Sequence, residues 1–304
     1  MTTNTPIAGT EAGDRYRQAI AASSVPVDES TVKAAVEKIL DGAAAYANAD
    51  TYKFLLNSID LTTLNTEDSV RSVGAFVRKV NDFDSEYPQY GNVAAICVYS
   101  NFAETVDAEL DAQGVKIATV AGGFPTSQTF TAVKVADVAL AVAGGAEEID
   151  VVMNLGMLRD ANYEDLTDEL IEMRHTAKGA LMKVILETGA LRTPAAIREA
   201  SVLALYSEAD FLKTSTGKGY PGASPEAAWV MCSCIKEYYK ATGRKVGFKA
   251  SGGIRTVADA LVYYAIVKEV LGDEWLDPRY FRIGASSLAN AVLSALEEEE
   301  VNYF

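Results

Sequence analysis

Three lysines lie inside apolar, strand-like segments of this sequence of 304 residues, namely Lys183, Lys213 and Lys249. A charged lysine buried in such a segment is costly, so its charge must be paired or lost. Burial and a neighbouring ammonium group both lower the pKa of a lysine, and the neutral amine then attacks carbonyl carbons to form a Schiff base. The protonated imine withdraws electrons, so that an adjacent carbon–carbon bond forms or breaks. The three lysines therefore predict imine chemistry.

Asp150 supplies the carboxylate that a proton relay beside these lysines requires. It lies in the run EEIDVV, where Glu147 and Glu148 just before it are expected to be surface charges. Two plainer interpretations remain open, which are a single lysine that reaches solvent at a strand end and an aspartate that caps a loop. The recurrence of three lysines and Asp150 at equivalent places favours a shared site.

Glycines, hydroxyls and cations follow three later strand-like segments and predict an anion site. Glycines let backbone N–H groups approach an anion, and helix N-termini attract negative charge. The loops after strands seven and eight often bind phosphate in α/β barrels. A tight turn also explains a single Gly-Gly pair, but two such loops with cations nearby favour phosphate. The residues expected to bind it are Gly217, Lys218, Gly252, Gly253, Arg255, Gly284, Ser286 and Ser287, with Thr216 beside them.

The elements that must position these residues are strands that alternate with helices. Helix starts are signalled at Thr126-Ser127, Thr193-Pro194, Ser224-Pro225 and Thr256. The alternation predicts parallel βαβ units, and eight of them match a closed (β/α)8 TIM barrel, whose active site forms at the carboxyl ends of the strands. An open doubly wound sheet is the alternative. The expected strands lie at residues 52–60, 92–100, 116–121, 148–153, 181–187, 210–216, 245–251 and 280–285.

The sequence divides into three regions. Residues 1–50 are expected to form an N-terminal helical extension that caps the barrel, with a helix at residues 31–45 across its bottom. Residues 51–296 form the barrel, and residues 297–304 form an acidic tail that begins where the last helix ends.

The composition excludes several classes of function. A net charge of −15 argues against nucleic acid as a partner, because phosphate neutralisation needs a basic surface. One histidine, His175, and three cysteines exclude a His-rich or Cys-rich zinc site, and we expect His175 on a helix surface. We see no signal peptide and no apolar stretch long enough to span a membrane. Together with the scattered cysteines, these features predict a cytoplasmic protein.

Seven segments of the chain resemble deoxyribose-phosphate aldolase, a family of class I aldolases. They include the runs IDLTTLN, LKTSTGK and GFKASGGIR, and they span residues 52–296. The resemblance implies that Lys213 is the Schiff-base lysine, Lys249 the second lysine that perturbs it and Asp150 the proton relay. It also places the anion-site residues on phosphate-binding positions. Supporting places in the pocket are implied for Asp60, Cys97, Lys183, Thr216 and Tyr303, although Phe304 follows the tyrosine where some relatives end in one.

The same resemblance implies the reaction. The enzyme would reversibly cleave 2-deoxy-D-ribose 5-phosphate to acetaldehyde and D-glyceraldehyde 3-phosphate, in deoxyribonucleoside catabolism. It would need no metal or organic cofactor, act on small molecules rather than nucleic acid or membranes, and form homodimers. Three alternatives are another lysine-dependent sugar-phosphate aldolase, a sugar-phosphate isomerase that enolises its substrate with a carboxylate base, and a non-catalytic phosphate-binding barrel.

Overall fold

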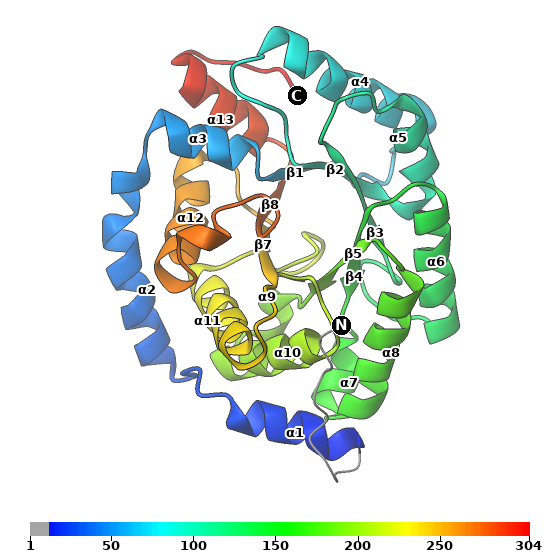
Figure 1. Cartoon of the computed structure of the whole chain (residues 1–304), viewed down its shortest axis with the longest axis vertical. Helices are drawn as coiled ribbons and strands as arrows, with labels where there is room; N and C mark the ends of the chain where they lie inside the picture. The colour runs from blue at the N-terminus through cyan, green and yellow to red at the C-terminus, as the bar shows by residue number, and fades with distance from the viewer. Residues whose placement is uncertain (1–11) are drawn as a thin grey trace.

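The computed structural model describes residues 12–304, in which eight parallel strands close into a barrel. The strands pair in sequence order, and β8 (Phe281–Ala285) completes the barrel by pairing with β1 (Ile59–Thr62) (Figure 1). Helices between successive strands form an outer ring, which confirms the predicted (β/α)8 fold. The other strands are β2 (Ala95–Tyr99), β3 (Lys116–Ala121), β4 (Glu148–Val152), β5 (Leu181–Ile185), β6 (Phe211–Lys213) and β7 (Gly247–Ser251).

Three of the four predicted helix starts are confirmed, whereas the helix expected after Thr126-Ser127 begins only at Thr131, after Phe130. Thr193, Ser224 and Thr256 accept hydrogen bonds at the starts of α10 (Pro194–Tyr206), α11 (Pro225–Thr242) and α12 (Val257–Val270). The other ring helices are α4 (Val70–Glu86), α5 (Ala103–Glu109), α6 (Thr131–Ala143), α7 (Leu155–Arg159), α8 (Tyr163–Thr176), α9 (Thr188–Leu191) and α13 (Leu288–Glu297), with the 3₁₀ helices η2 (Ser100–Phe102) and η3 (Asp273–Trp275).

The strand register brings the predicted reactive residues to one level of the barrel. Asp150 of β4 pairs beside Lys183 of β5, and Lys213 of β6 pairs beside Lys249 of β7. Side chains alternate along a strand, so residues in register on neighbouring strands point to the same side. The apolar residues between the charged ones pack outward against the helices, as Met182 and Leu212 do in the main hydrophobic core. Strand alternation thus separates a charged interior from an apolar outer layer.

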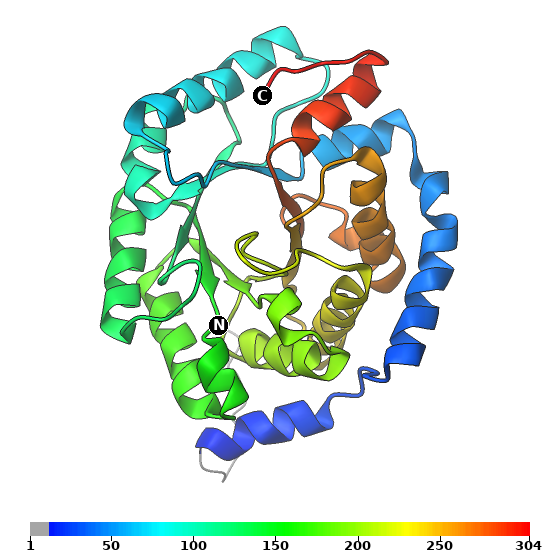
Figure 2. The same ribbon diagram turned by 180° about the vertical axis from the view of Figure 1, so that it is seen from behind.

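The N-terminal extension is helical, but it does not cap the barrel. Its helices are α1 (Ala12–Ala22), α2 (Glu29–Ala43), η1 (Ala44–Tyr46) and α3 (Ala49–Leu56). Helix α1 packs against α8 and α10, and α2 packs against α11 and α12. Both lie outside the helical ring in the two opposite views (Figures 1 and 2). The expectation that residues 31–45 cover the bottom of the barrel is wrong, because the barrel is filled by its own side chains and the apolar stripe of α2 finds its partner on the ring.

The first strand is shorter than the sequence pattern indicates. Residues 52–56 of the predicted strand belong to α3, and β1 starts only at Ile59. Asn48 caps this helix by accepting a hydrogen bond from the Thr51 N–H at 3.0 Å. Leu55 and Leu56 are fully buried, and such apolar residues are as compatible with a buried helix face as with a buried strand. A short apolar run does not distinguish the two by its pattern alone.

The acidic run near the C-terminus ends the last helix, as predicted. Helix α13 stops at Glu297, and Glu298 has the left-handed φ of 58°. The chain then folds back, and the N–H groups of Tyr303 and Phe304 donate to the Asn290 side-chain oxygen. None of the helices within residues 12–304 combines the length and apolar character that crossing a membrane requires.

Candidate active site

The three predicted lysines converge on Asp150 inside the barrel. The Nζ atoms of Lys213 and Lys249 each donate to Oδ2 of Asp150 at 2.7 Å. The Nζ atom of Lys183 donates to the other oxygen, Oδ1, at 2.8 Å. All four side chains are buried, and Lys213 is the most exposed of them at 3%. The structure therefore brings the predicted lysines and carboxylate into direct contact.

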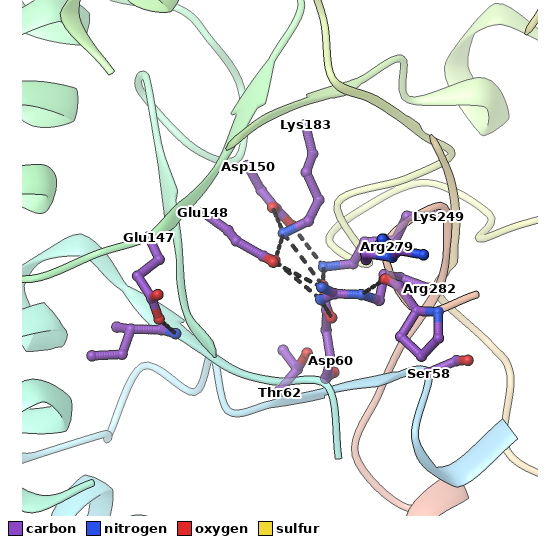
Figure 3. A network of polar contacts seen from close by, with 12 residues as sticks. Ser58, Asp60, Thr62, Glu147, Glu148, Asp150, Lys183, Lys249, Arg279 and Arg282 are labelled. Carbon is purple, nitrogen blue, oxygen red and sulfur yellow. Dashed lines mark hydrogen bonds and ion pairs between the residues drawn. The ribbon is translucent and has the colours of Figure 1, made fainter. Parts of the chain in front are cut away.

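A second layer of charges lies beside this cluster (Figure 3). Asp60 contacts Lys249 and accepts from Arg282 at 2.6 Å. Glu148 contacts Lys183 at 2.6 Å and accepts from Arg282 at 2.8 Å. Asp60 and Lys183, which were predicted to have supporting places in the pocket, thus lie in direct contact with the cluster. Glu148 and Arg282 join them, two residues that the sequence reasoning missed.

Glu148 corrects the expectation that it is a surface charge. Its side chain is 2% exposed, whereas Glu147 pairs with Lys116 at 2.7 Å with both side chains 46% exposed. Glu148 and Asp150 are two residues apart on β4, so they face the same side of the sheet. The same period of two relates Arg282 to Gly284 on β8. This alternation was the signal that could have placed both residues in the interior.

The charge balance of the network favours a neutral amine on one of its lysines. Three carboxylates (Asp60, Glu148 and Asp150) face four cations (Lys183, Lys213, Lys249 and Arg282), so full ionisation leaves one positive charge unpaired. Burying an unpaired charge is unfavourable, and the neutral form of one lysine removes it.

Lys213 is the lysine whose environment favours the neutral amine. Burial lowers its pKa below the ordinary 10.5, and Lys249 lowers it further, although Asp150 opposes both. Burial also disfavours the charged forms of Lys249 and Lys183, but there the neighbouring carboxylates outweigh it and raise the pKa of each amine. For Asp150 the three lysines outweigh burial and hold its pKa well below 3.8. The site therefore combines a nucleophilic amine with a carboxylate and two ammonium groups.

A cavity of about 280 Å³ opens beside Lys213 and is lined by the loops that follow β1, β6, β7 and β8. Lys218 crosses one side of it and donates to the Leu64 carbonyl at 2.6 Å. Ser287 precedes α13 without making a side-chain capping bond, so its side chain leaves the first N–H groups of the helix available to an anion. Every residue predicted for the anion site lines this cavity, as do Thr62, Leu64, Asn65, Ser251, Ile254 and Ala285, which were not predicted to do so.

Glycine is required at one place beside this cavity and makes room for a side chain at another. A Cβ atom at Gly222 would lie 2.1 Å from the Gly252 carbonyl oxygen, so the two loops approach as bare backbone. A Cβ atom at Gly284 would lie 3.0 Å from Cε of Lys249. The second contact means that Gly284 makes room for the lysine as well as lining the anion cavity.

Comparison with known proteins identifies the family. A family model described as DeoC/LacD family aldolase matches residues 54–293. The chain belongs to the DeoC/LacD aldolase family. It is 39% identical over 250 residues to the deoxyribose-phosphate aldolase of Homo sapiens and 40% identical over 250 residues to that of Mus musculus, covering 77% of each pair of chains. A solved structure titled a tetrameric deoxyribose phosphate aldolase from Aeropyrum pernix has 26% identity and a TM-score of 0.66, covering 84% of this chain and 96% of its own.

Two supporting residues lie beside the core of this aldolase site. The hydroxyl of Thr216 donates to the carboxylate of Glu187, which is 3% exposed. Burial raises the pKa of Glu187, although Thr216 and Lys213 lower it in part. Cys97 is fully buried on β2, and burial raises the pKa of its thiol. Its environment therefore favours a neutral thiol that packs against the interior.

The structure of this aldolase places Tyr303 against α4 rather than at the anion cavity. Its hydroxyl donates to the Lys79 carbonyl of α4 at 2.9 Å, and its ring packs edge-on against Phe83 at 5.4 Å. His175 is exposed on α8, as expected. Within residues 12–304 no group of three His, Cys, Asp or Glu side chains has an arrangement that could hold a metal ion.

Proposed function

We propose that this aldolase reversibly cleaves 2-deoxy-D-ribose 5-phosphate to acetaldehyde and D-glyceraldehyde 3-phosphate through an imine on Lys213. One observation carries the assignment of the lysine. Lys213 lines the anion cavity, and it is the member of the lysine cluster whose pKa is lowered. The phosphate group would lie among the glycines of the cavity, near Lys218, Arg255 and the start of α13. The sugar aldehyde would then reach the amine.

In the cleavage direction, the neutral amine of Lys213 attacks C1 of the open-chain sugar. Loss of water gives the protonated imine, and the relay through Asp150 and Lys249 removes the proton of the C3 hydroxyl. The C2–C3 bond then breaks, its electron pair moves to C2, and D-glyceraldehyde 3-phosphate leaves with the new C3 aldehyde. Protonation of the enamine at C2 and hydrolysis of the imine release acetaldehyde and restore the amine.

The charges of the network favour these reaction steps. The neutral Lys213 leaves three carboxylates paired with three cations before substrate binds. Imine formation then creates a positive charge next to Asp150 Oδ2, an oxygen that already contacts both lysines at 2.7 Å. A charge that develops beside a fixed carboxylate is stabilised without reorganisation of the site.

Trapping the imine tests this proposal. Sodium borohydride added with acetaldehyde should reduce the imine to a stable ethyl adduct, and peptide mapping should find it on Lys213. Lys213→Leu should lose the adduct and the cleavage activity together, whereas the surface variant Lys116→Met should keep both. An adduct on Lys183 or Lys249 instead would overturn the assignment of the nucleophile. Sugar-phosphate isomerisation without any adduct would favour the enolising alternative.

We also propose that the enzyme is a cytoplasmic homodimer that acts in deoxyribonucleoside catabolism. The pathway is consistent with the family, and the three free, buried cysteines suit a reducing compartment. Sedimentation velocity distinguishes the dimer from a monomer and from a tetramer like the one in the Aeropyrum pernix title.

A further inference from the structure

A second buried ion pair lies outside the catalytic network, between two helices of the ring. Lys134 of α6 is fully buried, and its Nζ atom contacts Oε1 of Glu169 on α8 at 2.6 Å. The other carboxylate oxygen of Glu169 accepts from the Thr131 hydroxyl at 2.9 Å. Burying a lysine and a glutamate is costly, and replacing such pairs by apolar residues is often neutral or stabilising. Stability alone therefore does not explain why the protein contains this pair.

The same lysine holds the loop between β3 and α6. Its Nζ atom donates to the hydroxyl of Ser127 at 2.7 Å. Ser127 is fully buried and has the left-handed φ of 59°, and its N–H donates to the Gly123 carbonyl at 2.9 Å. The start of the loop is held as well, because the Gly122 N–H donates to Asp137 of α6 at 2.9 Å. Helix α6 thus fixes residues 122–130 at two points.

This loop forms a wall next to the site. Phe124 packs edge-on against Tyr99 at 6.2 Å, and both rings cover a small apolar cluster in which Cys97 and Leu64 are buried. Leu64 lines the anion cavity. Farther along the loop, Pro125, Thr126 and Gln128 line a second cavity of about 320 Å³ together with Glu187 and Lys218, two residues of the site already described.

We propose that Lys134 and Glu169 are positioning residues that hold the 122–130 loop, and with it Phe124, as the apolar wall that limits the size of the donor aldehyde. The inference rests on the proposed function, because it concerns the aldehyde that Lys213 activates. Acetaldehyde carries one methyl group beyond its carbonyl, and a fixed wall excludes a donor with one more carbon. The buried pair fixes the wall because neither charge can leave its partner without remaining unpaired in the protein interior.

The variant that tests this must not leave a buried charge alone. Removing Lys134 alone would strand the Glu169 carboxylate and destabilise the fold, so both are changed together in Lys134→Met/Glu169→Gln. The matched control is Lys116→Met/Glu147→Gln, which removes the exposed ion pair at the first residue of β3. Both double variants lose one positive and one negative charge.

The readout is the ratio of kcat/KM for acetaldehyde to kcat/KM for propanal as donors. The ratio is independent of the fraction of folded enzyme, so a merely structural role does not change it. One methylene in an apolar pocket is worth a discrimination of roughly 10-fold to 200-fold. We expect the Lys134→Met/Glu169→Gln enzyme to lose at least about fivefold of this ratio and the control to stay within about twofold of the unmodified enzyme. An unchanged ratio in Lys134→Met/Glu169→Gln overturns the proposal.

Hydrogen–deuterium exchange separates this proposal from the proposed function. The Ser127 amide should exchange faster in Lys134→Met/Glu169→Gln and at the original rate in the control, whereas the Gly122 amide, which Asp137 holds, is the internal reference. Unchanged exchange shows that the pair does not hold the loop and overturns the inference, even if Lys213 forms its imine. Absence of the Lys213 adduct in the unmodified enzyme overturns the proposed function instead, whatever the exchange rates are.

Discussion

Replacing Lys249 by methionine should shift the pH dependence of imine formation upward. The Nζ atoms of Lys213 and Lys249 both lie 2.7 Å from Asp150 Oδ2, so they are at most twice that distance, about 5.4 Å, apart. Two unit charges at this distance repel by about 3 kcal/mol at an effective dielectric constant of about 20, which corresponds to a factor of roughly 100 in an equilibrium constant. Removing the charge of Lys249 relieves this repulsion and leaves Asp150 Oδ2 to Lys213 alone. Both changes favour the ammonium form of Lys213.

The expected result is a raised pKa for Lys213 and a slower reaction near neutral pH. The neutral fraction of an amine falls tenfold for each unit by which its pKa exceeds the pH, so the rate near pH 7 should fall by up to about 100-fold. The assay is the rate of reductive trapping with acetaldehyde and cyanoborohydride across a pH series. The rate of Lys249→Met should recover as the pH rises. A fall by one constant factor at every pH, with an unmoved profile, would refute the electrostatic role of Lys249.

Two further variants test the packing around the site. In Gly284→Ala the new methyl group would lie 3.0 Å from Cε of Lys249, so we expect displacement of this lysine and at least about tenfold slower turnover with a small change in Tm. Gly42→Ala is the control, because no atom lies within 4 Å of the added carbon, and full turnover in both would contradict the explanation. Tyr303→Ala should lower the free energy of unfolding by about 1–3 kcal/mol through lost aromatic packing and leave kcat and KM unchanged, as denaturant unfolding and steady-state assays will show. A large drop in kcat would mean that Tyr303 reaches the substrate.

The barrel and most of the site geometry follow from sequence pattern. Lys213 and Lys249 each occupy an apolar strand, and parallel pairing in register places them side by side. The glycine-rich loops after β7 and β8 line the anion cavity because a closed barrel gathers all the strand ends at one face. These conclusions need only local periodicity and the closure of the barrel.

Other features depend on contacts that local pattern does not encode. Glu148 looked like half of an exposed acidic pair, and its burial depends on Arg282, which lies 134 residues away. The placement of α2 outside the ring depends on its contacts with α11 and α12. Tyr303 lies against α4 because the chain after Glu298 turns back on α13, a reversal that follows from one left-handed residue.

The contacts of Asp60 connect the chemistry to the last event in the assembly of the fold. Asp60 comes from the first strand, whereas its cationic partners Lys249 and Arg282 lie 189 and 222 residues farther along the chain. In a chain that has not yet joined β8 to β1, these pairs are not formed. The protonation of its lysines should therefore differ from that in the closed barrel. We therefore expect a nascent chain whose last strand is still inside the ribosome to lack the complete network around Lys249. During refolding, the ability to form the imine should appear when β8 pairs with β1 and the barrel closes.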